Sequence, residues 1–195
     1  MTAGRHADSE PEDFRRALET LRSVAYRPEL TVLETPAPQR LAPYAVALTA
    51  EVFDDDDVEV GGGRLVVLYD PDGVEAWEGE FRVVAFVKAD LEPELASDPL
   101  LAEVGWSWLR DALALHEAPF AALGGTVTRT TSESYGVISD RPVEGQVEIR
   151  ASWTPLDTDL TPHARAWAEV LALAVGLPPL PPGVTALPSP RSRRS

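Results

Sequence analysis

The segment 144–153, EGQVEIRASW, alternates apolar and polar residues with a period of two. One face carries Val147, Ile149, Ala151 and Trp153, and the other carries Gln146, Glu148, Arg150 and Ser152. Successive side chains of a strand point to opposite faces, so the pattern predicts a strand with one buried and one solvated face. Strands of this kind belong to an antiparallel sheet that is covered on one side only.

Further strands are predicted at 29–34, 44–52, 64–70, 74–89 and 125–135. The segment 71–73, PDG, is expected to close a β-hairpin between 64–70 and 74–89, because proline presets φ and glycine accepts a positive φ. The proline-rich segment 35–43 is expected to be extended and irregular. The segment 53–63, FDDDDVEVGGG, is expected to form a loop.

Three helices are predicted at 10–26, at 99–116 and from Thr161 to Gly176. Ser9 and Glu12 have the spacing of a capping box, and Asp98 precedes Pro99 as an N-cap would. The order of elements is therefore helix, four strands, helix, two strands, helix. This order predicts an α+β fold with a mainly antiparallel sheet of about five to six strands covered by three helices.

The predicted domain organisation is simple. Residues 10–177 form a single α+β domain, 1–9 a flexible N-terminus, and 178–195 a proline-rich strap with a frayed basic tail.

Composition excludes several classes of function. No apolar run approaches the roughly 20 residues that span a bilayer, and the first 25 residues lack the apolar stretch of a secretory signal. We therefore expect a cytoplasmic protein without a membrane partner. The absence of cysteine excludes disulfides and cysteine-based metal sites, and a net charge of −15 disfavours direct binding to nucleic acid.

No catalytic residue, metal site or cofactor is predicted. The acidic run 54–57 lacks the phasing of a calcium loop, and the glycines at 61–63 precede a strand, whereas a phosphate-binding loop precedes a helix. The stretch 105–109, GWSWL, has leucine in place of the last glycine of a nucleophile elbow and lies inside a helical pattern.

The helical pattern around GWSWL makes a different prediction. It places Trp108 on the apolar arc with Leu101, Val104, Ala112 and Leu115, and it turns Ser107 toward water. Trp106 falls at the boundary of this arc, beside the polar stripe that contains Glu103 and Arg110. These three residues are the candidate protein-binding surface.

A second group of polar residues is expected on the solvated face of the sheet. Its members are Glu78, Glu80, Arg82, Lys88, Arg129, Glu133, Glu148 and Arg150. If strand pairing brings them together, Arg82, Glu148 and Arg150 are the candidate contacts for a small ligand.

The segments PAPQRLAPYAVALTAEV, EAWEGEFRVVAFVKADLEPE, DPLLAEVGWSWLRDAL and QVEIRASWTP resemble those of the Domain of Unknown Function 3000 family of actinobacteria. The segments 53–63 and 189–195 depart from the family pattern. The family implies no activity, substrate or catalytic residue. The order of the elements is also weakly similar to that of secretion-chaperone folds, which present a sheet and its flanking helices to another polypeptide.

Two functional hypotheses follow. The first is a non-catalytic adaptor or chaperone-like module that binds a protein through the surface around Trp106, or forms a homodimer through a helix or a sheet edge. The alternative is an enzyme or small-ligand-binding protein that uses the polar face of the sheet.

Overall fold

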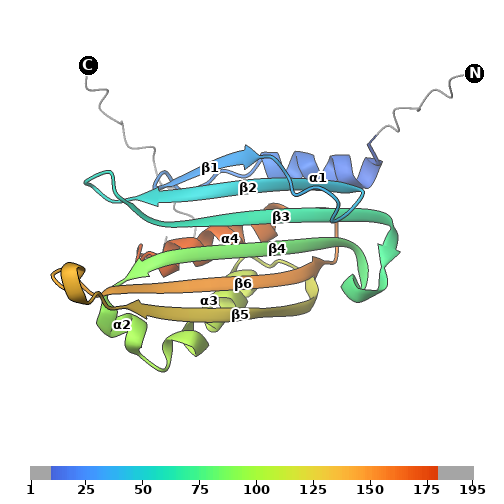
Figure 1. The fold of residues 1–195 in the computed structure, drawn as a ribbon. Helices are drawn as coiled ribbons and strands as arrows, with labels where there is room; N and C mark the ends of the chain where they lie inside the picture. Colours follow the sequence, from blue (N-terminus) through green and yellow to red (C-terminus); the bar gives the residue numbers. More distant parts are fainter. Residues whose placement is uncertain (1–9, 180–195) are drawn as a thin grey trace, which may run out of the picture.

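Six antiparallel strands form one sheet, and helices cover one of its two faces (Figure 1). The computed structural model describes residues 10–179. Neighbouring strands follow the order β1-β2-β3-β4-β6-β5, so β1 and β5 are the two edges. The predicted flexible N-terminus at 1–9, with its capping residue Ser9, and the predicted strap and tail from residue 180 onward lie outside the described residues.

The elements have the following bounds. The strands are β1 Leu30–Thr35, β2 Tyr44–Phe53, β3 Glu59–Val74, β4 Gly79–Leu91, β5 Phe120–Ser132 and β6 Glu144–Pro155. The α-helices are α1 Glu12–Arg22, α2 Pro93–Ser97, α3 Leu101–Leu115 and α4 Thr161–Ala174, with single 3₁₀ turns at Glu75–Trp77 and Gly136–Ile138.

The prediction of an α+β fold with an antiparallel sheet is confirmed. The short helix α2 was not predicted, because its five residues are too few to show a helical period. The weak similarity to secretion-chaperone folds stays a prediction.

The core lies between the sheet and the helices α1, α3 and α4. The predicted apolar face of β6 points into this layer, where Val147, Ile149 and Trp153 are buried. Trp167 of α4 packs on the same side and is also fully buried. Its indole Nε1 donates a hydrogen bond of 3.2 Å to the backbone oxygen of Phe86, which ties α4 to the middle of β4.

The glycines at 61–63 belong to β3, so the prediction of a loop over 53–63 is wrong in its second half. Gly61 and Gly63 let α4 and the residue that follows it approach the sheet. A Cβ on Gly61 would lie 2.4 Å from Cγ1 of Val175, and a Cβ on Gly63 would lie 2.8 Å from the oxygen of Phe86 and 3.1 Å from Nε1 of Trp167. The loop itself is confined to the turn between Phe53 and Glu59.

Gly63→Ala is expected to lower the free energy of unfolding by about 1–3 kcal/mol, because the added methyl overpacks the contact between Trp167 and β4. The matched control is Gly124→Ala, since a Cβ there meets no atom within 4 Å. This control should leave stability unchanged or raise it by about 0.4–1 kcal/mol. Urea unfolding curves measure both effects, and equal midpoints for the two variants would contradict the close approach of α4.

The hairpin between β3 and β4 turns later than expected. The chain reverses at 75–78, where Glu78 adopts a left-handed φ of 59°, and not at the predicted PDG segment. The PDG segment instead makes a local irregularity within β3. The amide of Asp72 donates to Oδ1 of Asp70 at 3.1 Å, Gly73 has a φ of 73°, and the register with β4 shifts between Tyr69 and Val74.

Two of the predicted helices are shorter than expected. Helix α1 begins at Glu12 after Pro11 and ends at Arg22 instead of residue 26. Helix α3 begins two residues later than predicted, because Oδ1 of Asp98 accepts a 2.8 Å hydrogen bond from the amide of Leu100 in the turn that precedes the helix. Helix α4 begins at Thr161 as predicted and is followed by Gly176, which has a φ of 76°.

Candidate functional site

The face of the sheet opposite the helices is only partly covered. At one end, Ala37 and Ala42 from the β1–β2 connection pack on a small apolar cluster that includes Val66 and Leu68. Arg64 fixes this connection by donating a 2.7 Å hydrogen bond to the oxygen of Pro36. The remainder of the face, formed by β4, β6 and β5, faces the viewer in Figure 1 and is called the open face below.

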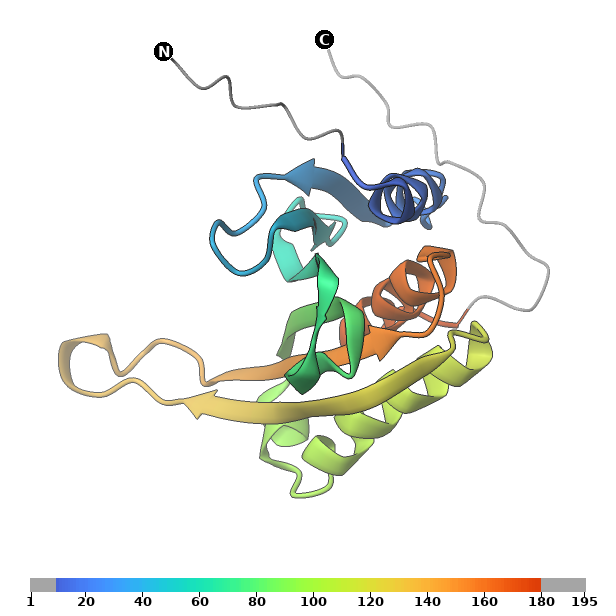
Figure 2. The ribbon, with the colours of Figure 1, turned by 90° about the vertical axis from the view of Figure 1, so that its right-hand side faces the viewer.

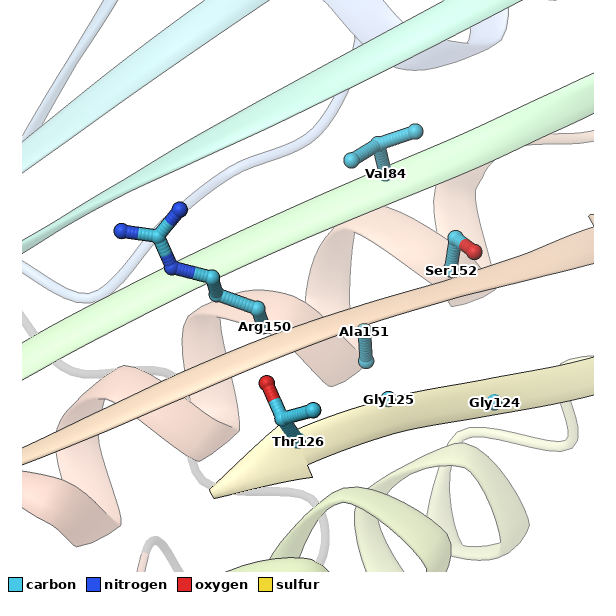
Figure 3. Close-up of a pocket in the computed structure, with 7 residues that line it drawn as sticks. All are labelled: Val84, Gly124, Gly125, Thr126, Arg150, Ala151 and Ser152. Atoms are coloured by element: carbon cyan, nitrogen blue, oxygen red, sulfur yellow. The ribbon is translucent and has the colours of Figure 1, made fainter. Parts of the chain in front are cut away.

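A shallow hollow of about 420 Å³ lies on the open face. Its floor is a row of small residues that sit opposite one another in the ladder, Val84 on β4, Ser152 on β6 and Gly124 on β5. The next row, Phe86, Arg150 and Thr126, is bulkier and bounds the hollow on one side. Figure 3 shows these strands contributing the lining residues side by side.

Arg82 does not line the hollow but contacts Ser152, which does. Its guanidinium donates to Oγ of Ser152 at 2.7 Å, to Oγ1 of Thr154 at 3.1 Å and to the backbone oxygen of Ala122 at 3.0 Å. Ala122 has a φ of 49° in the bulge of β5, so Arg82 holds this irregular part of the edge strand in place. Burial lowers the pKa of Arg82, and no carboxylate of the described residues forms an ion pair with it.

Arg150 is fixed by two contacts of its own. Its Nε donates a 2.5 Å hydrogen bond to Oε1 of Glu148, which raises the pKa of the arginine, and its guanidinium carbon lies 5.2 Å from the centroid of the Phe86 ring. The side chain therefore lies along the sheet beside the hollow. About two thirds of it remains exposed to solvent.

The structure places Arg82, Glu148 and Arg150 on the open face, together with Lys88, which sits opposite Glu148 in the ladder. Glu148 and Arg150 contact each other, whereas the side chain of Arg82 contacts Ser152, Thr154 and Ala122. Arg129 was placed in this group wrongly. It follows Val127 by two residues on the helix side of β5, and its Nη1 donates to the backbone oxygens of Ser97 and Asp98. The sequence did not identify Gly124, because its role depends on the register between β5 and β6.

The second candidate surface lies at the edge of the sheet. Strand β5 pairs with β6 alone, and no described residue pairs with its outer edge. The stretch GGTVTRTTS at 124–132 is almost wholly exposed and contains no acidic residue and no proline. The edge therefore presents unpaired backbone donors and acceptors over a long segment.

Trp106 lies beneath this edge on the helix side. A Cβ on Gly125 would be 2.9 Å from Cζ3 of Trp106, so the indole packs directly on the glycine of β5. Glu103 and Arg110 are exposed, as predicted. Trp106, Glu103 and Arg110 thus belong to helix α3, whereas Arg82, Glu148 and Arg150 lie on the opposite face of the sheet.

The predicted apolar arc of α3 is rotated from the true one. Trp108 is only half-buried, and Val104 and Leu115 are exposed. The buried side of the helix includes Gly105, where a Cβ would lie 3.2 Å from Cγ1 of Val127. The helix sits so close to the sheet because this position has no side chain, and an apolar pattern does not identify such a contact.

The β5–β6 connection projects from the body on the side away from the helices (Figure 2). Its tip carries apolar side chains that are exposed to solvent, among them Tyr135 and the fully exposed Val137. No pattern in the sequence identified this tip. It extends the exposed surface that begins along β5.

Two classes of feature are absent from residues 10–179. None of the helices described there is long and apolar enough to cross a membrane. No group of three or more His, Asp or Glu side chains in this part of the chain is arranged to hold a metal ion.

Comparison with known proteins identifies a family for this chain but no curated protein or solved structure that is similar to it. Neither a curated protein nor a solved structure matches the chain significantly. A family profile described as a protein of unknown function, DUF3000, matches residues 10–185, which include all the strands and helices described above. The chain belongs to the DUF3000 family.

Proposed function

We propose that the protein is a non-catalytic binding module, adaptor-like or chaperone-like, that accepts an extended segment of a partner protein along the outer edge of β5. The observation that carries this proposal is the unpaired edge itself. An added strand satisfies its backbone groups, and main-chain hydrogen bonds of this kind supply affinity that depends little on sequence.

The two edges of the sheet differ in a way that supports the proposal. Strand β1 is six residues long, is followed by Pro36, and carries Glu34, which pairs with Arg22 of α1 at 2.9 Å. Short length, charge and proline are the means by which proteins protect an edge from pairing with another chain. Strand β5 has thirteen residues, and Arg129 is its one charged side chain. The bulge of β5 lies between Ala121 and Gly124, so residues 124–132 form a regular edge that is protected only by the single charge of Arg129.

Helix α3 supplies side-chain contacts next to this edge. Trp106 is half-buried against Gly125, so a partner strand placed beside β5 would cover the rest of the indole. Tryptophan and arginine are the residues that most often dominate binding energy at interfaces. Glu103 and Arg110 stand on the same side of the helix and would select the charges of the partner segment.

The charge of the chain narrows the class of partner. At a net charge of −15 the protein attracts a basic polypeptide and repels an acidic one over long range. The edge itself carries no acid between Phe120 and Ser132, so strand pairing buries no carboxylate. We therefore propose a basic partner whose extended segment is uncharged at the residues that face β5.

Affinity purification of the tagged protein from its native cytoplasm at low salt, followed by mass spectrometry, should recover a stoichiometric partner. Thr130→Pro and Thr131→Pro provide the test of position. Both threonines are exposed, and neighbouring amides of a strand point to opposite sides, so one proline removes an outward N–H and the other breaks a bond to β6.

The proline that breaks a hydrogen bond to β6 should lower the unfolding midpoint. The proline that removes only an outward N–H should keep the midpoint of the wild type, so this result identifies the variant with the altered outer edge. We expect this variant and Trp106→Ala to lose the partner. Light scattering of the same proteins shows whether that partner is a second copy of the chain. Recovery of the partner at wild-type yield with both variants would contradict binding at β5.

A further inference from the structure

The hollow on the open face is distinct from the β5 edge and rests on different observations. It opens to the side of the sheet away from α3, whereas Trp106 lies on the helix side. A side chain at 124 would occupy it, yet a Cβ at Gly124 meets no atom within 4 Å and the backbone there has no positive φ. Neither packing nor conformation therefore requires glycine at this position. What the glycine does is leave the hollow open.

One lining residue of the hollow is an arginine, Arg150, and a second arginine, Arg82, touches the lining from outside the hollow. Arg82 contacts Ser152, which forms part of the floor. Arg82 and Val84 are two positions apart on β4, as are Val84 and Phe86, and the ring of Phe86 lies under Arg150. The small residues of the floor thus lie between two guanidinium groups.

Arg82 is the less compensated of these two groups. It is half-buried, and its three acceptors are two hydroxyls and one backbone oxygen, none of which carries a charge. A half-buried cation held by neutral groups is stabilised further by an anion nearby. Arg150 forms an ion pair with Glu148 through its Nε. Its side chain remains mostly exposed, and its other N–H groups are free for a second acceptor.

We infer that this hollow binds a small organic anion with a flat apolar body. The body lies on Val84 and Gly124, and a carboxylate or phosphate group pairs with Arg150 while it accepts hydrogen bonds from Thr126 or Ser152. A guanidinium fork fits both kinds of anion, and a volume of about 420 Å³ is within the range of small-molecule sites.

The test uses ¹H–¹⁵N correlation spectra of the full chain titrated with benzoate, phenyl phosphate and the uncharged analogue benzamide. Benzoate or phenyl phosphate should shift the amides of residues 124–126 and 150–152. Benzamide, which has the same ring and no charge, should bind at least about tenfold more weakly. Comparison of the two anions identifies the preferred group.

Two variants test the position. Gly124→Val fills the hollow, and Thr126→Glu places a carboxylate opposite Arg150 in the ladder, where it competes with the ligand. Each should weaken binding of the preferred anion at least about tenfold. Thr128→Val is the matched control, because Thr128 lies on the same face one row beyond the hollow, and it should leave the affinity unchanged.

The inference is overturned if none of the three probes shifts these amides at about 10 mM, since small anions in a built site bind in the millimolar range or better. It is also overturned if the shifts persist in both Gly124→Val and Thr126→Glu, or if benzamide binds as well as the anions. Should Gly124→Val unfold, Thr126→Glu alone decides, because position 126 is exposed.

Discussion

Trp167→Ala is expected to lower the free energy of unfolding by about 3–5 kcal/mol, the range found when a buried tryptophan or phenylalanine is truncated. The side chain is fully buried between α4 and the sheet, and its Nε1 donates a hydrogen bond to the backbone oxygen of Phe86. The substitution removes both the packing and the donor. It also leaves an unfilled cavity beside Gly63, whose lack of a side chain accommodates the indole.

Trp167→Phe separates the two contributions. The phenyl ring keeps most of the packing and loses the hydrogen bond, so we expect a smaller loss of about 1–3 kcal/mol. Urea unfolding followed by circular dichroism measures both variants. A loss below about 1 kcal/mol for Trp167→Ala would show that α4 does not anchor the sheet as described.

Stability is also expected to fall by about 3 kcal/mol between pH 7 and pH 4 because of His163 alone. This histidine is buried in the first turn of α4, where its Nδ1 accepts a 2.9 Å hydrogen bond from Nε1 of Trp153. Burial lowers the pKa of His163 from 6.5 to about 4. Its Nε2 is buried and has no hydrogen-bond partner among the described residues, so the neutral ring has no acceptor for its proton.

The direction of this pH dependence follows from the protonation state of His163 in the folded and in the unfolded chain. Above pH 6.5 the histidine is neutral in both the folded and the unfolded chain, and its contribution to stability is complete. Between pH 6.5 and about 4 the unfolded chain binds a proton that the folded chain excludes, so stability is lost as the pH falls. The difference between the two pKa values corresponds to about 3 kcal/mol.

His163→Asn is the control, because an amide oxygen can accept the hydrogen bond of Trp153 and asparagine does not titrate. Both proteins share every carboxylate, so the difference between their urea midpoints across this pH range reports the histidine. The wild type should lose about 3 kcal/mol more than the variant. Parallel pH profiles for the two proteins would contradict the account, because they would show that folding leaves the pKa of His163 unchanged.

The sequence predicts the fold well where one periodicity extends over a whole element. The alternation from Val147 to Trp153 identified β6 and its buried face, and the start of α4 at Thr161 was located to the residue. The sequence did not predict the contacts that depend on a close approach of the backbone, because such contacts leave no apolar side-chain pattern. Gly63 in a strand and Gly105 in a helix allow close approach of neighbouring elements, and neither contributes to an apolar period.

The candidate sites were less predictable than the fold. Arg82, Glu148 and Arg150 were correctly placed on one face, because alternation fixes which side of a strand a residue faces. The hollow could not be foreseen, since it depends on Gly124 standing opposite Ser152, and strand register is not readable from composition. The free edge of β5 likewise depends on the order of the strands, in which β6 pairs with β4 and leaves β5 outermost.

Amide hydrogen exchange of β5 tests the central claim most directly. The protein is purified from the cells that produce it with its bound partner, and exchange of the segment 120–132 is compared with that of the same protein stripped of the partner at high salt. We expect the outward amides of residues 124–132 to exchange rapidly in the free protein and to be protected in the complex, as in a newly paired strand. Unchanged exchange along β5, with protection confined to another part of the surface, would contradict strand addition at this edge.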